Sequence, residues 1–310
     1  MYRRRNEYPS LKQQTDWGKI MDEDLFGFIG LGNMGAPMVR NASTRGCKLI
    51  VHDIAGTADR ASADCIVAQS NDEVVRRSKV IGLSLPTIDA NRQVILEVAK
   101  AGAPGTVVVD TCTIGIDVAE KNAQILNEVG IQYLDSPVSG LKFRAEEGAL
   151  ISMVSGPASG LDKARKLIEG YSRAVGHVGA EAGQGQRMKV LNNAICIASY
   201  VISSEALAYG EAGGLKIDEM LAVVNESSGQ NFATKFLFPK YVATGLYDES
   251  GAEAHIVEKD ISLFVKGANG DGTPSKTIEA AYDIIKAFTN TNPLQDQMRI
   301  YPYVRGLQRD

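Results

Sequence analysis

The chain has 310 residues, of which 44% are hydrophobic and 23% are charged, and its formal net charge is −4. This length is sufficient for two domains with separate hydrophobic cores, and the composition is typical of a soluble globular protein. The small negative charge provides no basic field for binding nucleic acid or an anionic membrane. Four cysteines and three histidines are scattered along the chain, which predicts reduced thiols, a cytoplasmic location and no metal site.

The first 24 residues include three consecutive arginines at positions 3–5 but no apolar segment of a secretory signal. We predict that residues 1–24 form a disordered or loosely docked extension, with Met21 as a candidate functional start. No run of 18 apolar residues is present in the sequence, which predicts that no helix spans a membrane.

A glycine-rich turn follows the first predicted strand, at residues 25–30. Gly30, Gly32 and Gly35 have the spacing G-x-G-x-x-G, which suits a tight turn, close approach of a pyrophosphate, and close packing of strand and helix. The start of the following helix provides free N–H groups for phosphates. The residues expected to contact a dinucleotide here are Gly30, Leu31, Gly32, Asn33, Met34 and Gly35.

A second apolar strand ends at Asp53, 18 residues after Gly35. This is where a dinucleotide-binding unit places the acid that binds the adenosine ribose. The alternative is that Asp53 only forms a turn. Its charge would repel a 2′-phosphate and the nearest downstream arginine is Arg60, so we predict NAD as the cofactor rather than NADP.

The rest of the first half alternates between predicted strands and helices. Further strands are expected at 49–52, 80–85, 107–110, 132–136, 149–155 and 174–178, and helices at 36–44, 72–77, 90–101 and 117–129. Continuous apolar strands that alternate with helices predict an α/β domain with a Rossmann-type, doubly wound parallel sheet covered on both faces. We assign residues 25–182 to this domain.

The character of the sequence changes at residues 183–185, where Gly-Gln-Gly precedes a long helix predicted at 186–211. Helices at 217–225, 252–269 and 275–288 follow, which predicts an all-helical domain from 183 to 310. The long helix carries more apolar surface than one domain can cover. We expect it to span both domains and to contribute to a subunit interface.

Polar or loop-forming residues follow three predicted strands, at the sheet edge where ligands bind in such folds. They are Leu85-Pro86, Thr113 and Ser139-Gly140. Thr113 could bind the nicotinamide ribose or the substrate, or cap the next helix. Ser139 and the N–H groups around Gly140 could bind a carboxylate, or form a simple turn.

Two charged groups lie on the predicted helices of the second half. Lys189 and Asn193 are four residues apart and share one helix face with Cys196 and Tyr200. Residues 258–260 are Glu-Lys-Asp. From the residue pattern alone, solvated surface charge is the better interpretation of both groups.

The sequence resembles the β-hydroxyacid dehydrogenase family, which includes 3-hydroxyisobutyrate dehydrogenase and tartronate semialdehyde reductase. The stretches that carry this resemblance, in the same order along the chain, are 30–38, 85–86, 110–113, 135–140, 183–193 and 259–260. The stretches at 135–140 and 183–193 are specific to that family, and the resemblance covers about residues 25–307. It implies a Rossmann domain joined by a long helix to an all-helical domain, in homodimers or homotetramers.

The resemblance also implies roles for individual residues. Lys189 matches the catalytic lysine, and Ser139, Gly140, Asn193 and Asp260 are expected to contact a small anionic substrate. Leu85, Pro86, Thr113 and Lys259 are expected to contact NAD. The implied activity is NAD-dependent interconversion of a short 3-hydroxy acid and its semialdehyde or oxo acid. A lysine whose pKa is lowered by desolvation in a closed cleft can serve as its general acid and base.

The sequence departs from the family pattern around the expected substrate site. Leu141 and Arg144 stand where relatives commonly carry glycine, Cys112 replaces a serine, and residues 252–255, in the segment before Lys259, supply no aromatic side chain. Two other functions therefore stay open: reduction of a larger or sulfonated aldehyde acid, and dinucleotide binding without turnover, as in a sensor or scaffold. Arg144 either binds a second anionic group of the substrate or lies on the surface near Glu146 and Glu147.

Overall fold

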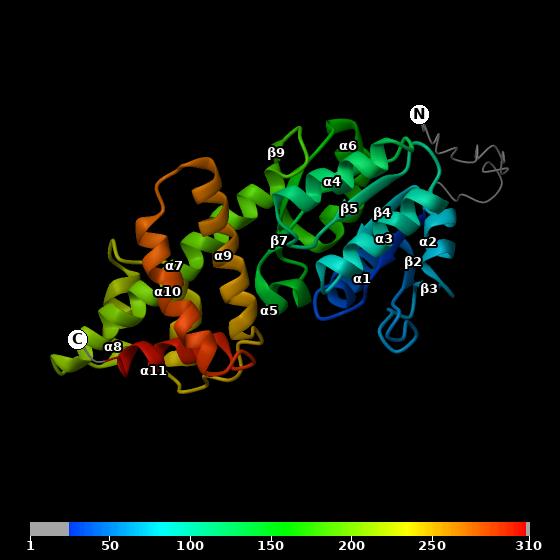
Figure 1. The fold of residues 1–310 in the computed structure, drawn as a ribbon. Coiled ribbons are helices and arrows are strands. Elements are labelled where there is room, and N and C mark those ends of the chain that lie inside the picture. The colour runs from blue at the N-terminus through cyan, green and yellow to red at the C-terminus, as the bar shows by residue number, and fades with distance from the viewer. Residues whose placement is uncertain (1–24, 308–310) are drawn as a thin grey trace, which may run out of the picture.

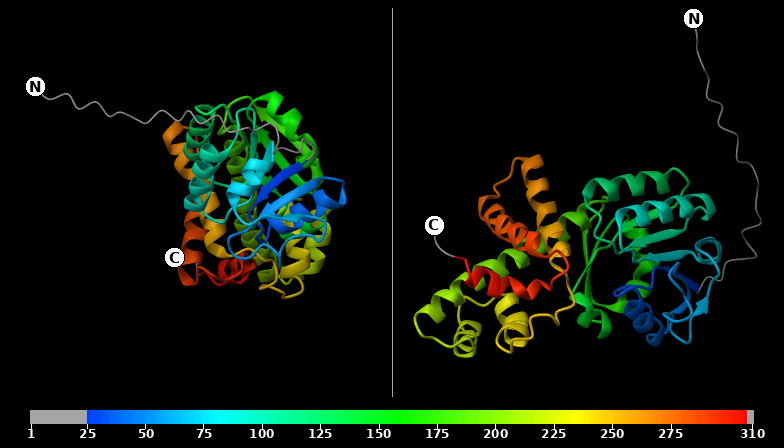
Figure 2. Two further views of the ribbon diagram at one scale, coloured as in Figure 1. Left: turned by 90° about the vertical axis from the view of Figure 1, so that its right-hand side faces the viewer. Right: turned by 60° about the horizontal axis from the view of Figure 1, so that its bottom comes forward.

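The computed structural model describes residues 25–307, so the predicted N-terminal extension and Met21 lie outside the described residues. Two lobes are visible in Figure 1, one built on a β-sheet and one of helices alone. Helix α7 (Gln184–Ala212) passes from the sheet lobe into the helical lobe. The right-hand view of Figure 2 again shows the two lobes side by side, whereas in the left-hand view the sheet lobe lies in front of the helical lobe.

Within the described residues, nine strands form one sheet in the order β3-β2-β1-β4-β5-β6-β8-β7, and β9 pairs with β8. Their bounds are β1 Leu25–Ile29, β2 Lys48–His52, β3 Ile66–Val67, β4 Val80–Leu83, β5 Val107–Asp110, β6 Gln132–Asp135, β7 Val138–Ser139, β8 Leu150–Ser155 and β9 Ser172–Gly179. The strand predicted at 80–85 thus ends two residues early, and the two-residue strands β3 and β7 were not predicted.

The sheet is parallel from β3 to β6, as predicted, but β8 runs antiparallel to both β6 and β7. The prediction of a wholly parallel sheet is therefore wrong at this edge. The connection from β6 to β8 contains only β7 and the six-residue helix α5 (Leu141–Glu146). A parallel crossover usually needs a longer helix that covers the sheet.

Helices cover both faces of the sheet because successive residues of each strand point to opposite sides. Phe26 and Phe28 of β1 belong to a core with α1 and α6, whereas Leu25 and Ile29 belong to a core with α2, α3 and α4. The helix bounds are α1 Gly35–Thr44, α2 Asn71–Arg77, α3 Ile88–Ala101, α4 Ile116–Asn127 and α6 Ala158–Tyr171.

The helical lobe has a core of its own, in which Phe238 and Tyr301 pack edge to face and side chains of α7 take part. Its remaining elements are α8 Ile217–Asn225, the π-helix η2 Ala233–Val242, α9 Ala254–Asp271, α10 Lys276–Thr291, the 3₁₀-helix η3 Gln297–Arg299 and α11 Ile300–Arg305. The helix predicted at 217–225 matches α8, whereas η2, which contains Pro239, was not predicted.

Helix α7 is the longest element, and it contacts β6, β8 and β9 of the sheet lobe as well as α8 to α11 of the helical lobe. By length and composition alone it could cross a membrane, although more than half of its most apolar stretch of 18 residues is buried inside the protein. A core helix shared by two lobes explains that apolar composition without a membrane.

Candidate active site

The glycine loop joins β1 to α1, and two of its glycines allow the backbone to close on itself. Gly30 has φ = +95°, and a side chain there would approach the Ser84 carbonyl oxygen to 2.2 Å. A side chain on Gly35 would come within 2.0 Å of the Gly30 carbonyl oxygen. Gly32 instead faces open space, with nothing within 4 Å. The middle glycine therefore leaves room for a ligand, as a pyrophosphate requires.

A cavity of about 390 Å³ lies beside this loop, and we call it the glycine-loop cavity. Its lining includes Gly32 and Asn33 together with the basic side chains of Arg40, Arg60 and Lys142. Backbone N–H groups at a helix start, combined with cations, suit the phosphates of a dinucleotide. These residues therefore fit NAD.

Asp53 lies where β2 ends and reaches the glycine loop. Its carboxylate accepts hydrogen bonds from the backbone N–H groups of Leu31 at 2.6 Å and of Ala55 at 2.7 Å. It thus forms a turn and also lies against the glycine loop, where the adenosine ribose is expected. The guanidinium of Arg60 is 3.6 Å from the same carboxylate.

The loops after β4 and β5 meet near the glycine loop. The backbone N–H of Leu85 donates to the thiol of Cys112 at 3.1 Å, and Pro86 is exposed beside it. Thr113 is half-buried next to Cys112. The alternative that Thr113 caps the next helix is wrong, because α4 begins at Ile116 with Gly115 as its N-cap and no side-chain cap.

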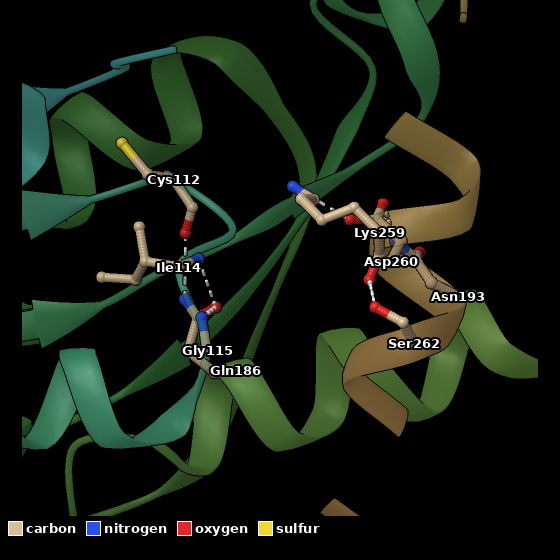
Figure 3. Close-up of polar contacts among 8 residues, drawn as sticks. All are labelled: Cys112, Ile114, Gly115, Gln186, Asn193, Lys259, Asp260 and Ser262. Carbon is tan, nitrogen blue, oxygen red and sulfur yellow. Dashed lines mark hydrogen bonds and ion pairs between the residues drawn. The ribbon is translucent and has the colours of Figure 1, made fainter. Parts of the chain in front are cut away.

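Gln186, on the first turn of α7, holds this loop to the rest of the site, as Figure 3 shows. Its amide oxygen accepts from the backbone N–H groups of Ile114 at 3.0 Å and Gly115 at 3.1 Å. Its amide nitrogen donates to the Cys112 carbonyl at 2.9 Å and to Asp135 at 2.6 Å. Sequence reasoning did not identify Gln186, because its partners lie 51 to 74 residues away.

The expected substrate contacts line one cavity of about 510 Å³ between the two lobes, which we call the Lys189 cavity. Ser139 and Gly140 come from the sheet lobe, Lys189 and Asn193 from α7, and Asp260 from α9. Met34 of the glycine loop also lines it, so the cavity adjoins the expected cofactor site. Among the described residues, no group of three His, Cys, Asp or Glu side chains is placed to hold a metal ion.

Lys189 is only 9% exposed, so it is not the solvated surface lysine that its pattern alone favoured. Burial lowers the pKa of its ammonium, and the charge of Lys259 lowers it further. Asp260 and Cys196 raise this pKa, but less than burial lowers it. The environment therefore favours a lysine that exchanges a proton more readily than one in water.

A chain of polar contacts links the substrate side of the cavity to α9, and Figure 3 shows its part from Asn193 to Lys259. Asn193 donates to Asp260 Oδ2 at 2.8 Å, and Lys259 Nζ lies 3.1 Å from Asp260 Oδ1 as an ion pair without hydrogen-bond alignment. Asn192 donates to Asn193 at 3.2 Å and to Ser139 Oγ at 3.4 Å. Asn192 was not predicted, and its position beside Asn193 was the only available signal.

Two residues that depart from the family pattern also line the Lys189 cavity, namely Leu141 and Arg144. Leu141 has φ = +59° and is the one non-glycine residue with positive φ among the described residues. A leucine in this conformation is strained, whereas the glycine that the family resemblance leads us to expect there would not be. Its side chain packs against the core of the helical lobe. Arg144 is half-buried and lines this cavity, so it is not a fully solvated surface residue.

Comparison with known proteins identifies related sequences over nearly the whole described chain. Residues 25–179 match the family model of the NAD-binding domain of 6-phosphogluconate dehydrogenase. Residues 183–304 match that of the NAD-binding domain of NADP-dependent 3-hydroxyisobutyrate dehydrogenase.

Individual relatives agree with the two family models. The NAD-dependent L-serine dehydrogenase of Pseudomonas aeruginosa is 34% identical, over 79% of this chain and 86% of its own. The 2-(hydroxymethyl)glutarate dehydrogenase of Eubacterium barkeri is 30% identical, over 80% of this chain and 83% of its own. The structure of Mycobacterium tuberculosis 3-hydroxyisobutyrate dehydrogenase with L-serine superposes with a TM-score of 0.82 at 29% identity, over 91% of this chain and 99% of that one. The chain therefore belongs to the β-hydroxyacid dehydrogenase family.

Proposed function

We propose that Lys189 is the general acid and base with which this chain interconverts a short 3-hydroxy acid and its semialdehyde or oxo acid. The class of the enzyme, an NAD-dependent oxidoreductase acting on a hydroxyl group, follows from its family. The observation that carries the proposal for Lys189 is its burial in a cavity that Ser139, Asn193 and Asp260 also line and that adjoins the glycine loop.

The cofactor is proposed to lie along the edge formed by the strand ends. The glycine loop, residues 30–35, would hold the pyrophosphate, and Asp53 would hold the adenosine ribose. Leu85, Pro86 and Thr113 would contact the nicotinamide half, with Lys259 reaching it from α9. When bound, the nicotinamide exchanges a hydride with the substrate carbon, which is chemistry that side chains cannot supply.

The protein supplies the proton and the orientation. In oxidation, neutral Lys189 takes the proton of the substrate hydroxyl as the carbonyl forms. In reduction, the Lys189 ammonium donates a proton to the carbonyl oxygen and stabilises its developing negative charge. Ser139 and the backbone at Gly140 hold the substrate carboxylate. Asn193, fixed by its hydrogen bond to Asp260 at 2.8 Å, orients the group next to Lys189.

A small substrate with a carboxylate agrees with the relatives, whose names specify L-serine, 2-(hydroxymethyl)glutarate and 3-hydroxyisobutyrate. We further propose that residues 25–182 act as the cofactor domain and 183–310 as the helical domain, and that the enzyme is cytoplasmic.

Assembly into a homodimer or homotetramer is part of the same proposal. Ile195, Ile202 and Tyr209 follow one another at intervals of seven residues on α7 and are 63%, 52% and 80% exposed. Residues seven apart lie on nearly the same face of a helix. A stripe of exposed apolar side chains of this kind is typical of a helix covered by a second subunit.

The test is a panel of short 3-hydroxy acids and semialdehydes assayed with NAD or NADH in the wild type and in Lys189→Ala. We expect the variant to lose about 10²- to 10⁴-fold in turnover, the usual contribution of a positioned acid–base group, with NAD affinity almost unchanged. Lys216→Ala, which removes a lysine that is 74% exposed, is the matched control and should retain turnover. Near wild-type turnover in Lys189→Ala, with chemistry rate-limiting, would reject the assignment.

A further inference from the structure

Arg144 connects the expected substrate loop to the helical lobe. Its aliphatic stem covers Gly140, because a side chain on Gly140 would meet Arg144 Cβ at 2.8 Å and Cδ at 3.0 Å. Its guanidinium carbon lies 5.8 Å from the ring centroid of Phe143 and 5.6 Å from that of Phe236 on η2. Phe236 in turn contacts Phe232, which lines the Lys189 cavity. The guanidinium of Arg144 therefore lies near two aromatic rings, and Arg144 itself is part of the cavity wall.

The guanidinium of Arg144 has no carboxylate within 4 Å among the described residues. Glu146, on the same helix, pairs instead with Lys142 at 3.7 Å. Within the described lining of the Lys189 cavity, Asp260 is the one carboxylate, and its partners are Lys259 and Asn193. The planar donors of Arg144 are thus free for an anion that enters the cavity.

We propose that Arg144 binds a second anionic group of the substrate, beyond the carboxylate held at Ser139 and Gly140. This rests on the proposed function, which assigns the first carboxylate to that loop. The class of ligand is an oxyanion with at least two oxygens, since a guanidinium presents paired donors to a carboxylate, sulfonate or phosphonate. The substrate is then a dianionic hydroxy acid or its semialdehyde, and Arg144 distinguishes it from a monoanion of equal length.

Two other roles for Arg144 give different results. If Arg144 holds the one carboxylate that every substrate carries, its removal weakens the binding of monoanions and of dianions equally. If Arg144 only forms the cavity wall through its stem, replacing it with glutamine, which has a similar shape, changes the binding of neither kind of anion. Selectivity between a monoanion and a dianion of the same length therefore decides among the three roles.

The first experiment measures binding without turnover, by calorimetry on the full chain loaded with NAD. Glutarate and pentanoate have equal length and differ by one terminal carboxylate. We expect glutarate to bind at least 10-fold more tightly to the wild type, and Arg144→Gln to lose about 10- to 100-fold on glutarate alone, the scale of a charged hydrogen bond. Arg144→Lys, which keeps the charge but not the fork, should retain part of this preference. Arg165→Gln, which removes an exposed cation on α6, is the control and should retain all of it.

The second experiment measures kcat/KM on 2-(hydroxymethyl)glutarate, on 2-(hydroxymethyl)pentanoate, and on the analogue of the first with a terminal sulfonate. A preference for either dianion that Arg144→Gln abolishes supports the proposal, and the better dianion identifies the group. If Arg144→Gln loses kcat/KM equally on all three substrates, or loses none, the proposal is overturned. Lys189→Ala should lose turnover but retain the glutarate preference. Failure of the proposed function would therefore appear as turnover that survives Lys189→Ala, independently of Arg144.

Discussion

The side-chain amide of Gln186 donates a hydrogen bond to Asp135 at 2.6 Å, and the backbone N–H of Gln186 donates to the same carboxylate at 2.8 Å. This pair joins the end of β6 to the first turn of α7. Since Gln186 also holds residues 112–115, it connects the loop that carries Thr113 to the helix that carries Lys189, three residues further on. The spacing of the expected cofactor and acid–base groups therefore depends on a buried amide that contacts neither.

Replacing Gln186 with leucine should lower the free energy of unfolding by about 3 kcal/mol, because several buried polar groups lose their partner. Turnover should fall as well, since the Thr113 loop is no longer tied to α7. Urea denaturation and initial rates measure both effects. Gln184→Leu is the matched control, because Gln184 is exposed two residues earlier and should cost less than about 1 kcal/mol. Equal effects of the two substitutions would contradict this role.

Asp135 should make stability fall as the pH rises. Burial raises the pKa of its carboxyl from 3.8 to about 6, so the folded state retains this proton after the unfolded state has released it. The contribution to the free energy of unfolding is lost between about pH 4 and pH 6, and amounts to about 3 kcal/mol in total. Urea denaturation of the wild type and of Asp135→Asn at pH 4 and 7 isolates this term, because the variant does not titrate there. A difference between the two proteins that is constant with pH would reject it.

Asp260 and Lys259 should shift the pH profile of oxidation in opposite directions. Asp260 raises the pKa of Lys189 and Lys259 lowers it. Asp260→Asn should therefore move the rise of kcat/KM with pH to lower pH, since oxidation needs neutral Lys189. Lys259→Met should move this rise to higher pH. Profiles with a slow substrate measure both shifts, and a shift in the same direction for both variants would exclude Lys189 as the titrating group.

Asp53 should determine the choice between NAD and NADP. Its carboxylate is 3.6 Å from the guanidinium of Arg60, which can bind a 2′-phosphate once that carboxylate is removed. Asp53→Ala should therefore reduce the preference for NAD, measured as the ratio of kcat/KM values, by about tenfold or more. The double variant Asp53→Ala/Arg60→Ala should lose the gained use of NADP. Unchanged preference in Asp53→Ala would show that another residue selects the cofactor.

The larger elements of this fold were predictable because their signals are local. Glycines close the turn before α1, and the apolar strands β1, β2, β4, β5 and β6 match the predicted ones to within two residues. Strand β3 was missed because it is only two residues long and because both residues, Ile66 and Val67, are partly exposed. The antiparallel direction of β8 was missed because strand order and direction depend on pairing across the sheet, which a local pattern does not encode.

The site was predictable only where a residue type and its spacing limit the chemistry. Lys189, Asn193, Ser139 and Asp260 line one cavity, although their pattern alone favoured surface charge for the lysine. Gln186 and Asn192 were not identified, because a neutral amide has many roles and its partners are distant in sequence. The strain at Leu141 was also invisible, since backbone φ is known only once the loop is seen.

The position of Lys189 on α7 makes its proton affinity depend on how α9 of the helical lobe is placed. Three residues before it, Gln186 fastens this part of α7 to the sheet lobe, whereas Asp260 lies on α9 of the helical lobe. Any movement of α9 away from this part of α7 would therefore separate the carboxylate from the ammonium that it stabilises, and let water in. Closure would couple the proton affinity of Lys189 to the presence of ligand, so that the acid strength of this group depends on how the two lobes are held together.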